Sequence, residues 1–191
     1  MSVNMRFRSR MRSLNAPAEP SKQREIAPPE APSSTVCDDL PAAFRQAMRN
    51  ISSTVYVITL SSEGRRWGLT ATAVSSLSME PPSILACINH RASIHAPLIE
   101  SERFCLNALR CDQSQVASAF SSSGLGEDRF RAGRWVDFGG APAICDAVAN
   151  ILCRRSMTTS FGSHTVLVGE VEAVRVDDQA PPLIYRQGTF G

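Results

Sequence analysis

The stretch His164-Thr-Val-Leu-Val-Gly-Glu-Val-Glu-Ala-Val-Arg-Val176 predicts the fold class more directly than any other part of the chain. Its frequent valines favour an extended strand. Their spacing changes near Gly169, which predicts a β-bulge at that position. A second long strand is expected at residues 149–157, on the other side of a turn at Gly162. These two segments indicate an antiparallel sheet.

Shorter strands are expected upstream. Residues 54–60 are β-branched and apolar, and the sequence Ser61-Ser-Glu-Gly64 supplies a turn that makes a hairpin with residues 67–78. Two further strands are expected at residues 83–88, after the break at Pro81-Pro82, and at residues 104–109.

Three segments have helical spacing. Apolar residues recur at helical intervals over residues 40–51, with Asp38 or Asp39 as the N-cap and Pro41 in the first turn. Two shorter helices are expected at residues 93–101 and at residues 112–120, the second capped by Asp112. Many strands and few helices, without regular alternation, predict a mainly β fold with peripheral helices, an antiparallel barrel.

The first 37 residues differ in composition from the rest. Five of the 12 prolines lie there, among Ser, Arg, Glu and Gln and with few large apolar residues. Such a segment buries too little apolar surface to offset the entropy of ordering it. We therefore expect a disordered arm at residues 1–37 and one folded domain at residues 38–191, since a chain of 191 residues suits a single domain.

The charge distribution excludes some partners. Residues 1–37 carry six basic and three acidic residues, and residues 38–191 carry fourteen basic and fifteen acidic residues. A nearly neutral body lacks the basic face that nucleic acid requires. No apolar run approaches the roughly 18 residues of a membrane helix, so we expect neither nucleic acid nor membrane as a partner.

The six cysteines contain no Cys-x-x-Cys pair, and only three histidines accompany them. This spacing does not support a metal site. Cys87, Cys105 and Cys153 lie in apolar runs, where a free cysteine behaves as a small buried hydrophobic residue. Reduced cysteines are typical of a cytoplasmic protein.

Common catalytic motifs are absent: the sequence has no nucleophile elbow, P-loop, zinc-protease motif or Gly-x-Gly-x-x-Gly fingerprint. The segment Gly68-Leu-Thr-Ala-Thr-Ala-Val-Ser-Ser-Leu-Ser78 is instead rich in small and hydroxyl-bearing residues. Small residues allow a ligand to approach the backbone, and hydroxyls donate to anions or ring heteroatoms. A plain polar strand face or a Ser/Thr-rich hairpin is the alternative interpretation.

The segment Asn89-His-Arg-Ala-Ser93 follows a buried strand and precedes an expected helix. Arg91, the Ser93 hydroxyl and a helix N-terminus together form a candidate phosphate site. Alternatively, Ser93 is an ordinary N-cap and Arg91 a solvated charge. His164 is either a ligand-contacting or a structural histidine.

Several of these pieces together resemble the flavin reductase domain family over about residues 40–190. The resemblance is carried, in order and spacing, by Phe44–Met48, Thr54–Thr59, Gly68–Ser78, Pro81-Pro82, Phe104–Leu109, Gly140–Pro142, Cys153 and Gly162–Val171. It implies a split-barrel fold that binds flavin, and reduction of FMN or FAD by NADH or NADPH. It also implies a homodimer and transfer of the reduced flavin to a partner monooxygenase.

The resemblance also assigns residues to roles. The cofactor-binding positions that it implies are Thr70, Ala71, Thr72 and Ala73 along the isoalloxazine ring, Ser75 and Ser76 at the ribityl phosphate end, Cys87 and Asn89 in the same cleft, Arg91 and Ser93 in the phosphate-side loop, and Tyr185 in the closing strand. His164 is expected near the nicotinamide as the catalytic residue. The family's usual Thr-Ala-Asn-Ser is Thr-Ala-Thr-Ala here, and Ser163 replaces the usual Asp before His164.

Other functions of the same barrel remain open at this point. One is a corrinoid reductase that uses bound flavin, and another is a module that binds flavin or a tetrapyrrole without catalysis. The sequence does not distinguish FMN from FAD or NADH from NADPH, and it does not identify the final acceptor.

Overall fold

A computed structural model of the chain describes residues 39–122, 124–177 and 180–191. The predicted disordered arm at residues 1–37 lies outside these ranges. The helix predicted at residues 40–51 is confirmed as α1 (Leu40–Asn50). Its cap is Asp39, whose Oδ1 accepts a hydrogen bond from the Ala42 N–H at 3.1 Å.

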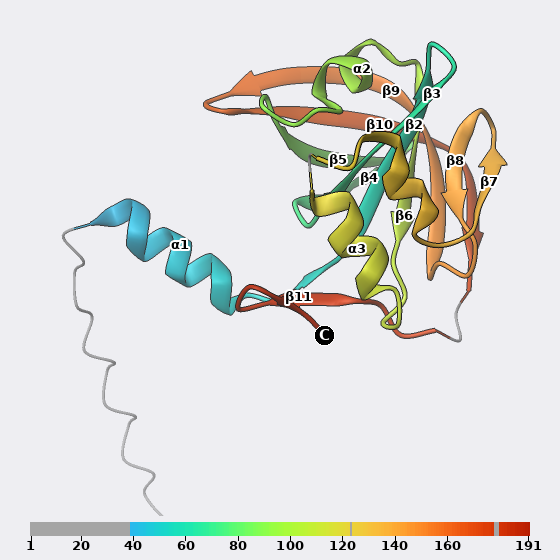
Figure 1. Cartoon of the computed structure of the whole chain (residues 1–191). Helices are drawn as coiled ribbons and strands as arrows, with labels where there is room; N and C mark the ends of the chain where they lie inside the picture. The colour runs from blue at the N-terminus through green and yellow to red at the C-terminus, as the bar shows by residue number, and fades with distance from the viewer. Residues whose placement is uncertain (1–38, 123, 178–179) are drawn as a thin grey trace, which may run out of the picture. The chain divides into compact units, whose positions relative to one another are not determined.

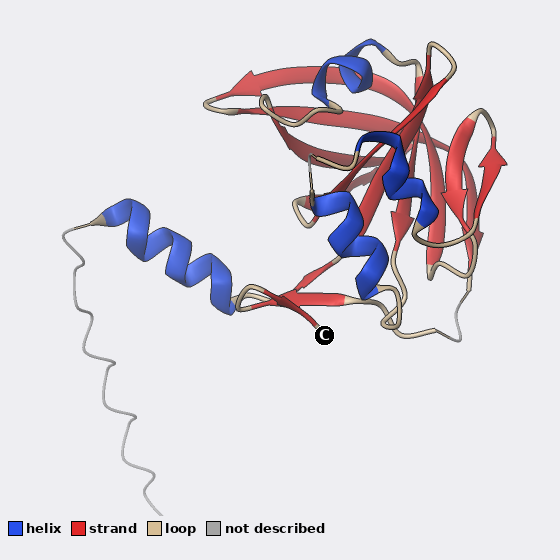
Figure 2. Cartoon of the chain, viewed as in Figure 1, coloured by secondary structure: helices blue, strands red, loops and turns tan. Residues whose placement is uncertain are grey.

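Strands make up about half of the described chain (Figure 2). They are β1 (Ser53–Thr54), β2 (Tyr56–Ser62), β3 (Arg65–Ala71), β4 (Val74–Met79), β5 (Pro82–Asn89), β6 (Arg103–Ala108), β7 (Trp135–Phe138), β8 (Ala141–Ile144), β9 (Ala149–Phe161), β10 (His164–Val176), β11 (Ile184–Arg186) and β12 (Thr189–Phe190). The remaining helices are α2 (His95–Glu100), α3 (Ser114–Ser121) and the 3₁₀ helix η1 (Gly126–Arg131).

Seven strands form the main sheet in the order β3-β2-β6-β9-β10-β5-β4 (Figure 1). All of its pairings are antiparallel. In the described part of the chain, β3 and β4 are the ends of this order, so the hydrogen bonding does not close into a ring. The predicted mainly β architecture with peripheral helices is confirmed.

The long hairpin of β9 and β10 has the predicted irregularity. Its register shifts between Val168 and Gly169 and again between Val171 and Ala173. A Cβ atom on Gly169 would lie 2.5 Å from the Phe104 ring and 2.9 Å from the Cys153 Cβ. Gly169 is therefore required by close packing under the bulge.

The segment predicted as one strand at residues 67–78 is two strands, which corrects the sequence interpretation. The chain leaves β3 at Ala71 and enters β4 at Val74, at the opposite end of the sheet. Thr72 and Ala73 make this crossing without glycine or proline, so the sequence lacks the usual turn signal. The Cys87 N–H donates to the Ala73 carbonyl at 2.9 Å and attaches the crossing to β5.

Two predicted helix starts are also wrong. Helix α2 begins at His95 without a side-chain cap, so Ser93 is not its N-cap. Helix α3 begins at Ser114, and Asp112 binds Arg110 through two hydrogen bonds of 2.7 Å. The carboxylate of Asp112 is thus used by a neighbouring guanidinium rather than by backbone N–H groups.

Gly68 accommodates an aromatic side chain. A Cβ atom there would lie 2.3 Å from the ring of Phe120 on α3. Phe120 is 1% exposed and packs edge-on to Phe130 with ring centroids 4.9 Å apart. Gly68 therefore serves the contact between β3 and α3.

A buried polar cluster joins β2, β6, β8 and β9. The Asn107 Nδ2 donates to the Val57 carbonyl at 2.9 Å and to Thr59 Oγ1 at 3.0 Å. Its Oδ1 accepts from the Ile144 N–H at 3.0 Å and from Asn150 Nδ2 at 2.8 Å. Each of these buried groups has a partner, as buried polar atoms require.

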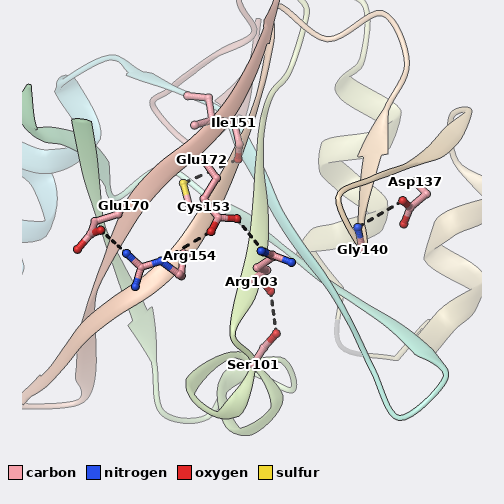
Figure 3. Close-up of polar contacts among 9 residues, drawn as sticks. All are labelled: Ser101, Arg103, Asp137, Gly140, Ile151, Cys153, Arg154, Glu170 and Glu172. Atoms are coloured by element: carbon pink, nitrogen blue, oxygen red, sulfur yellow. Dashed lines mark hydrogen bonds and ion pairs between the residues drawn. The ribbon is translucent and has the colours of Figure 1, made fainter. Parts of the chain in front are cut away.

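An ion-pair ladder lies on the outer side of β6, β9 and β10 (Figure 3). Arg103 Nε lies 2.7 Å from Glu172 Oε2, and Arg154 pairs with Glu170 and, at 3.7 Å, with Glu172. These side chains are partly exposed, so the pairs contribute little stability individually. They connect three strands on the face away from the core.

Candidate functional site

A pocket of about 500 Å³ lies at the crossing from β3 to β4. Residues 69–73, Cys87, Asn89, Ala92 and His164 line it. These residues come from β3, the crossing, β5, the loop after β5 and the start of β10. We call it the crossover pocket. It brings together seven predicted site residues: Thr70, Ala71, Thr72, Ala73, Cys87, Asn89 and His164.

The two threonines of this pocket have different hydrogen-bonding roles. Thr70 Oγ1 donates to the Ala117 carbonyl of α3 at 2.7 Å, so its proton is used within the fold. Among the described residues, no partner engages the hydroxyl of Thr72, which is half-buried. Thr72 is therefore the threonine whose proton is available to a ligand.

His164 stands at the first position of β10, beside the end of β5. It pairs in register with Asn89, is half-buried, and has its Nδ1 2.9 Å from Ser163 Oγ. The neutral hydroxyl of Ser163 thus contacts the ring nitrogen that a carboxylate could otherwise hold. Because Nδ1 is engaged, Nε2 is the ring nitrogen left for a ligand.

A second hollow of about 610 Å³ adjoins the crossover pocket and shares Asn89 with it. His90, Arg91 and Ser163 complete its lining. The Asn89 Oδ1 accepts from the Arg91 N–H at 2.9 Å, and the His90 N–H donates to the Ser163 carbonyl at 3.0 Å. These bonds fix the loop that carries the Arg91 side chain beside the crossover pocket.

Of the other five predicted residues, Arg91 lines the adjoining hollow, and four line neither of these two cavities. Ser75 and Ser76 lie on the exposed strand β4, where Ser75 Oγ donates to the Ser76 carbonyl at 3.0 Å. Tyr185 lies in the small sheet of β1, β11 and β12, with its ring 5.4 Å from that of Phe190. Ser93 lines a different pocket. The expected pair of Arg91 and Ser93 is thus divided between two sites.

This different pocket, which we call the arginine pocket, has a volume of about 330 Å³. Its side chains are Arg65, Arg66, Trp67, Ser93, Glu127 and Arg129, and backbone at Gly68 and Gly126 completes it. The sequence analysis missed its basic residues. The available signal was the pair Arg65-Arg66 next to Trp67, but η1, which supplies Arg129, has no spacing relation to them.

The described cysteines are free thiols in different surroundings. Burial raises the pKa of Cys105 and of Cys153 to about 12 in each case. Cys87 is only partly buried, because it faces the crossover pocket. Cys105 and Cys153 are therefore core residues, as predicted, whereas Cys87 belongs to the candidate site.

Residues 39–122, 124–177 and 180–191 contain no group of three or more His, Cys, Asp or Glu side chains that could hold a metal ion. Within the same ranges, the helices fall short of the length and apolar character needed to cross a membrane.

The crossover pocket has the properties of a site for a planar heterocyclic cofactor. Its walls include the backbone and methyl groups of Ala71, Ala73 and Ala92, which allow a flat ring to approach closely. Thr72 and Asn89 supply polar atoms at its edge, and the adjoining hollow offers the Arg91 guanidinium to a phosphate. The residues present therefore fit a flavin nucleotide, and fold and site together define a mainly β flavin-binding protein.

Comparison with known proteins identifies the family. The family model for the flavin reductase like domain matches residues 48–191. This match covers most of the chain, so the chain belongs to the flavin reductase family.

Individual relatives agree with this assignment. The chain is 42% identical over 150 residues to the FMN reductase (NADH) RutF of Methylorubrum populi, covering 78% of this chain and 74% of the relative. It is 40% identical over 150 residues to the reductase component of the FADH(2)-dependent resorcinol hydroxylase of Rhizobium sp., and the match covers 77% of this chain and 84% of that relative. Among solved structures, the NADH:FAD oxidoreductase SgcE6 of Streptomyces globisporus, in complex with NAD and FAD fragments, superposes with a TM-score of 0.75 at 27% identity, covering 79% of this chain and 91% of that one.

Proposed function

We infer that the protein is an NAD(P)H-dependent flavin reductase, which transfers a hydride from a reduced nicotinamide to FMN or FAD. The observation that carries this conclusion is the crossover pocket, where the crossing segment, Cys87, Asn89 and His164 line one cavity. Family membership and the reductase relatives support the same activity. We further propose that the reduced flavin is passed to a separate monooxygenase.

The protein's role in this reaction is to bind and orient. Flavin supplies the chemistry, because its N5 accepts a hydride from nicotinamide C4 when the two rings are stacked. The backbone of residues 70–73 would hold one ring face, and the Thr72 hydroxyl would donate to the ring edge. We propose that Arg91 binds the ribityl phosphate and that His164 orients the nicotinamide through Nε2. Holding two reactants in place is itself a large catalytic contribution.

The direct test is oxidation of NADH or NADPH, followed at 340 nm, with and without added FMN or FAD. We expect turnover that depends on the flavin. Absence of flavin-dependent turnover with either nicotinamide would contradict the proposed function. A yellow flavin that is retained by the purified protein but not bleached by NAD(P)H would instead indicate a binding module.

Two substitutions test the roles of residues in the site. Arg91→Ala should raise the KM for flavin much more than the KM for NADH, because only the flavin phosphate contacts the guanidinium in this proposal. His164→Ala should act mainly on nicotinamide binding and on the rate of flavin reduction, measured by stopped-flow absorbance. Equal effects on both KM values for Arg91→Ala, or an unchanged reduction rate for His164→Ala, would contradict these assignments.

We also propose a homodimer. Helix α1 has no buried residue, and its apolar face is open to solvent: Leu40 is 75%, Phe44 64% and Met48 48% exposed. Strand β4 is at an end of the sheet and exposes Leu77 and Met79. Exposed apolar surface of this kind favours association. Light scattering after size exclusion tests it, with Phe44→Glu expected to shift a dimer to a monomer.

The remaining proposals concern cellular context and chain organisation. We propose that the protein acts in the cytoplasm, where free cysteines are maintained. We also propose that residues 38–191 are the functional domain and that residues 1–37 are dispensable for flavin reduction. A chain that starts at residue 38 should retain flavin-dependent NADH oxidation.

A further inference from the structure

The arginine pocket contains a buried cation without an acidic partner. Arg129 is 5% exposed. Its Nε donates to the Gly126 carbonyl at 2.7 Å, its Nη2 donates to the Ser122 carbonyl at 3.0 Å, and its Nη1 donates to the Gly68 carbonyl. No ion pair joins Arg129 to a carboxylate among the described residues.

This arrangement leaves binding capacity in the pocket. A guanidinium has five N–H donors, and the three backbone carbonyls use three of them. Burial lowers the pKa of Arg129, because its charged form is partly removed from water. A buried cation is normally paired with an opposite charge, so a ligand anion would supply what the fold does not.

The other side chains of the pocket have compatible chemistry. The one carboxylate in the lining, Glu127, is engaged by Arg66 at 3.0 Å. Three arginines and one glutamate give the lining a net charge of +2, which matches the two negative charges of a dinucleotide's pyrophosphate bridge. The Arg65 guanidinium lies over the Trp67 ring at 4.9 Å, and such a flat stack can be extended by an adenine.

At two places, residues that are neighbours in the chain line the arginine pocket and the crossover pocket. Gly68 lines the arginine pocket and the next residue, Leu69, lines the crossover pocket. Similarly, Ala92 lines the crossover pocket and Ser93 lines the arginine pocket. One molecule with a heterocycle at one end and a pyrophosphate further along can therefore occupy both.

We propose that the arginine pocket binds the adenosine diphosphate half of a dinucleotide, with its phosphates on Arg129, Arg65 and Ser93 and its adenine against the stack of Arg65 and Trp67. The dinucleotide is the nicotinamide substrate, because the ADP of FAD includes the ribityl phosphate, which the proposed function assigns to Arg91 in the other hollow. Only the identity of the dinucleotide rests on the proposed function. The binding of ADP itself does not depend on catalysis.

The first experiment is calorimetric titration of the flavin-free full chain with ADP. We expect binding that Arg65→Gln weakens roughly tenfold, the usual effect of losing a charge-assisted hydrogen bond. The matched control is Arg131→Gln on η1, because the Arg131 side chain is 84% exposed, pairs with Asp128 and does not line the pocket. ADP that does not bind at millimolar concentration, or that binds equally to both variants, overturns the proposal.

Ser93→Ala and Arg129→Lys extend the test. Ser93 is exposed, so its substitution leaves the core intact and should weaken ADP binding by a smaller factor than Arg65→Gln. Arg129→Lys keeps the charge but loses the planar fork of five donors, of which the three carbonyls use three and leave two for a ligand. The affinity of this variant for ADP should fall. If the variant does not fold, the Arg65 and Ser93 variants still decide the outcome.

The second experiment identifies the dinucleotide from the KM values of Arg65→Gln. A raised KM for FAD with an unchanged KM for FMN would place the adenosine monophosphate of FAD here and overturn the assignment. A raised KM for NADH with an unchanged KM for reduced nicotinamide mononucleotide assigns it to the nicotinamide substrate. Equal increases for FMN and FAD would place the ribityl phosphate here and overturn the assignment. A chain that binds ADP but reduces no flavin would reject the proposed function and leave the pocket standing.

Discussion

Two polar regions of the main sheet use the same residue types for different purposes. In the cluster around Asn107, the side chains of Thr59, Asn107 and Asn150 are fully buried or nearly so and bond to one another and to backbone groups. In the crossover pocket, Thr72, Asn89 and His164 are half-buried or exposed, and the Thr72 hydroxyl has no partner among the described residues.

The difference shows what makes a polar group structural or functional. A buried polar group costs free energy unless it is hydrogen-bonded, so the Asn107 cluster has its partners within the protein. A group at the edge of a pocket is hydrated in the free protein and can exchange water for a ligand. The cluster therefore holds β8 against the sheet, and the pocket keeps hydrogen-bonding capacity for a cofactor.

The largest expected effect comes from making one substitution in both regions. Asn107→Ala removes one hydrogen-bond partner from each of four buried groups at once: the Val57 carbonyl, Thr59 Oγ1, the Ile144 N–H and Asn150 Nδ2. Buried groups left unpaired cost about 1 to 3 kcal/mol each, so we expect a loss of about 3 to 5 kcal/mol in the free energy of unfolding. Urea unfolding, followed by circular dichroism, measures it.

The matched variant is Asn89→Ala in the crossover pocket. Asn89 is exposed and its side chain has one bond, to the Arg91 N–H, so the loss of stability should stay below about 1 kcal/mol. Its effect should appear instead as a raised KM for flavin. If the two variants lost similar stability, the distinction between the regions would be wrong.

A nearly isosteric change in the two regions gives a smaller effect. Thr59→Val leaves Asn107 Nδ2 and the Pro142 carbonyl without their hydroxyl partner, at a cost of about 1 to 3 kcal/mol in stability. Thr72→Val should leave stability unchanged and raise the KM for flavin roughly five- to tenfold, the usual value of one neutral hydrogen bond. Steady-state kinetics and urea unfolding of both proteins test this pair, and a stable, fully active Thr59→Val would contradict it.

Much of the fold could be predicted from local pattern. The valines of β10, the change of spacing at Gly169 and the cap at Asp39 each depend on neighbouring residues, and the structure confirms all three. Seven of the nine residues that line the crossover pocket are positions that the family resemblance implied. These residues include the crossing segment, which itself has no turn signal.

The features that could not be predicted depend on contacts between distant segments. Gly68 lies in the segment of small residues, and the ring of Phe120, far along the chain, lies where a Cβ atom on it would be. Asp112 resembled a helix cap, but Arg110 competes for its carboxylate. Thr59 and Thr72 look alike in sequence, and only the strand partners decide which one is buried. Arg129 joins Arg65 through the fold alone.

The cysteines extend the comparison to a chemical probe. Because burial raises the pKa of Cys105 and Cys153 to about 12, both stay protonated at pH 8, and both are also inaccessible. Iodoacetamide should modify the exposed Cys111 first and Cys87 more slowly, with bound flavin protecting Cys87. Peptide mass spectrometry measures the order, and early modification of Cys105 would contradict it.

The smallest expected effect belongs to a polar group of a third kind, an exposed ion pair. The Arg110 guanidinium, through its hydrogen bonds, holds the pKa of Asp112 below its usual value. A carboxyl group whose pKa is lower in the folded state stabilises the fold above its unfolded pKa, and this contribution is lost as the pH falls through the folded pKa. Asp112→Asn should therefore be slightly less stable than the natural chain at pH 7, and the difference should vanish in acid once the carboxyl is protonated in both states. Urea midpoints across this pH range measure it, and a difference that grows in acid would mean that Asp112 is not held as an anion by Arg110.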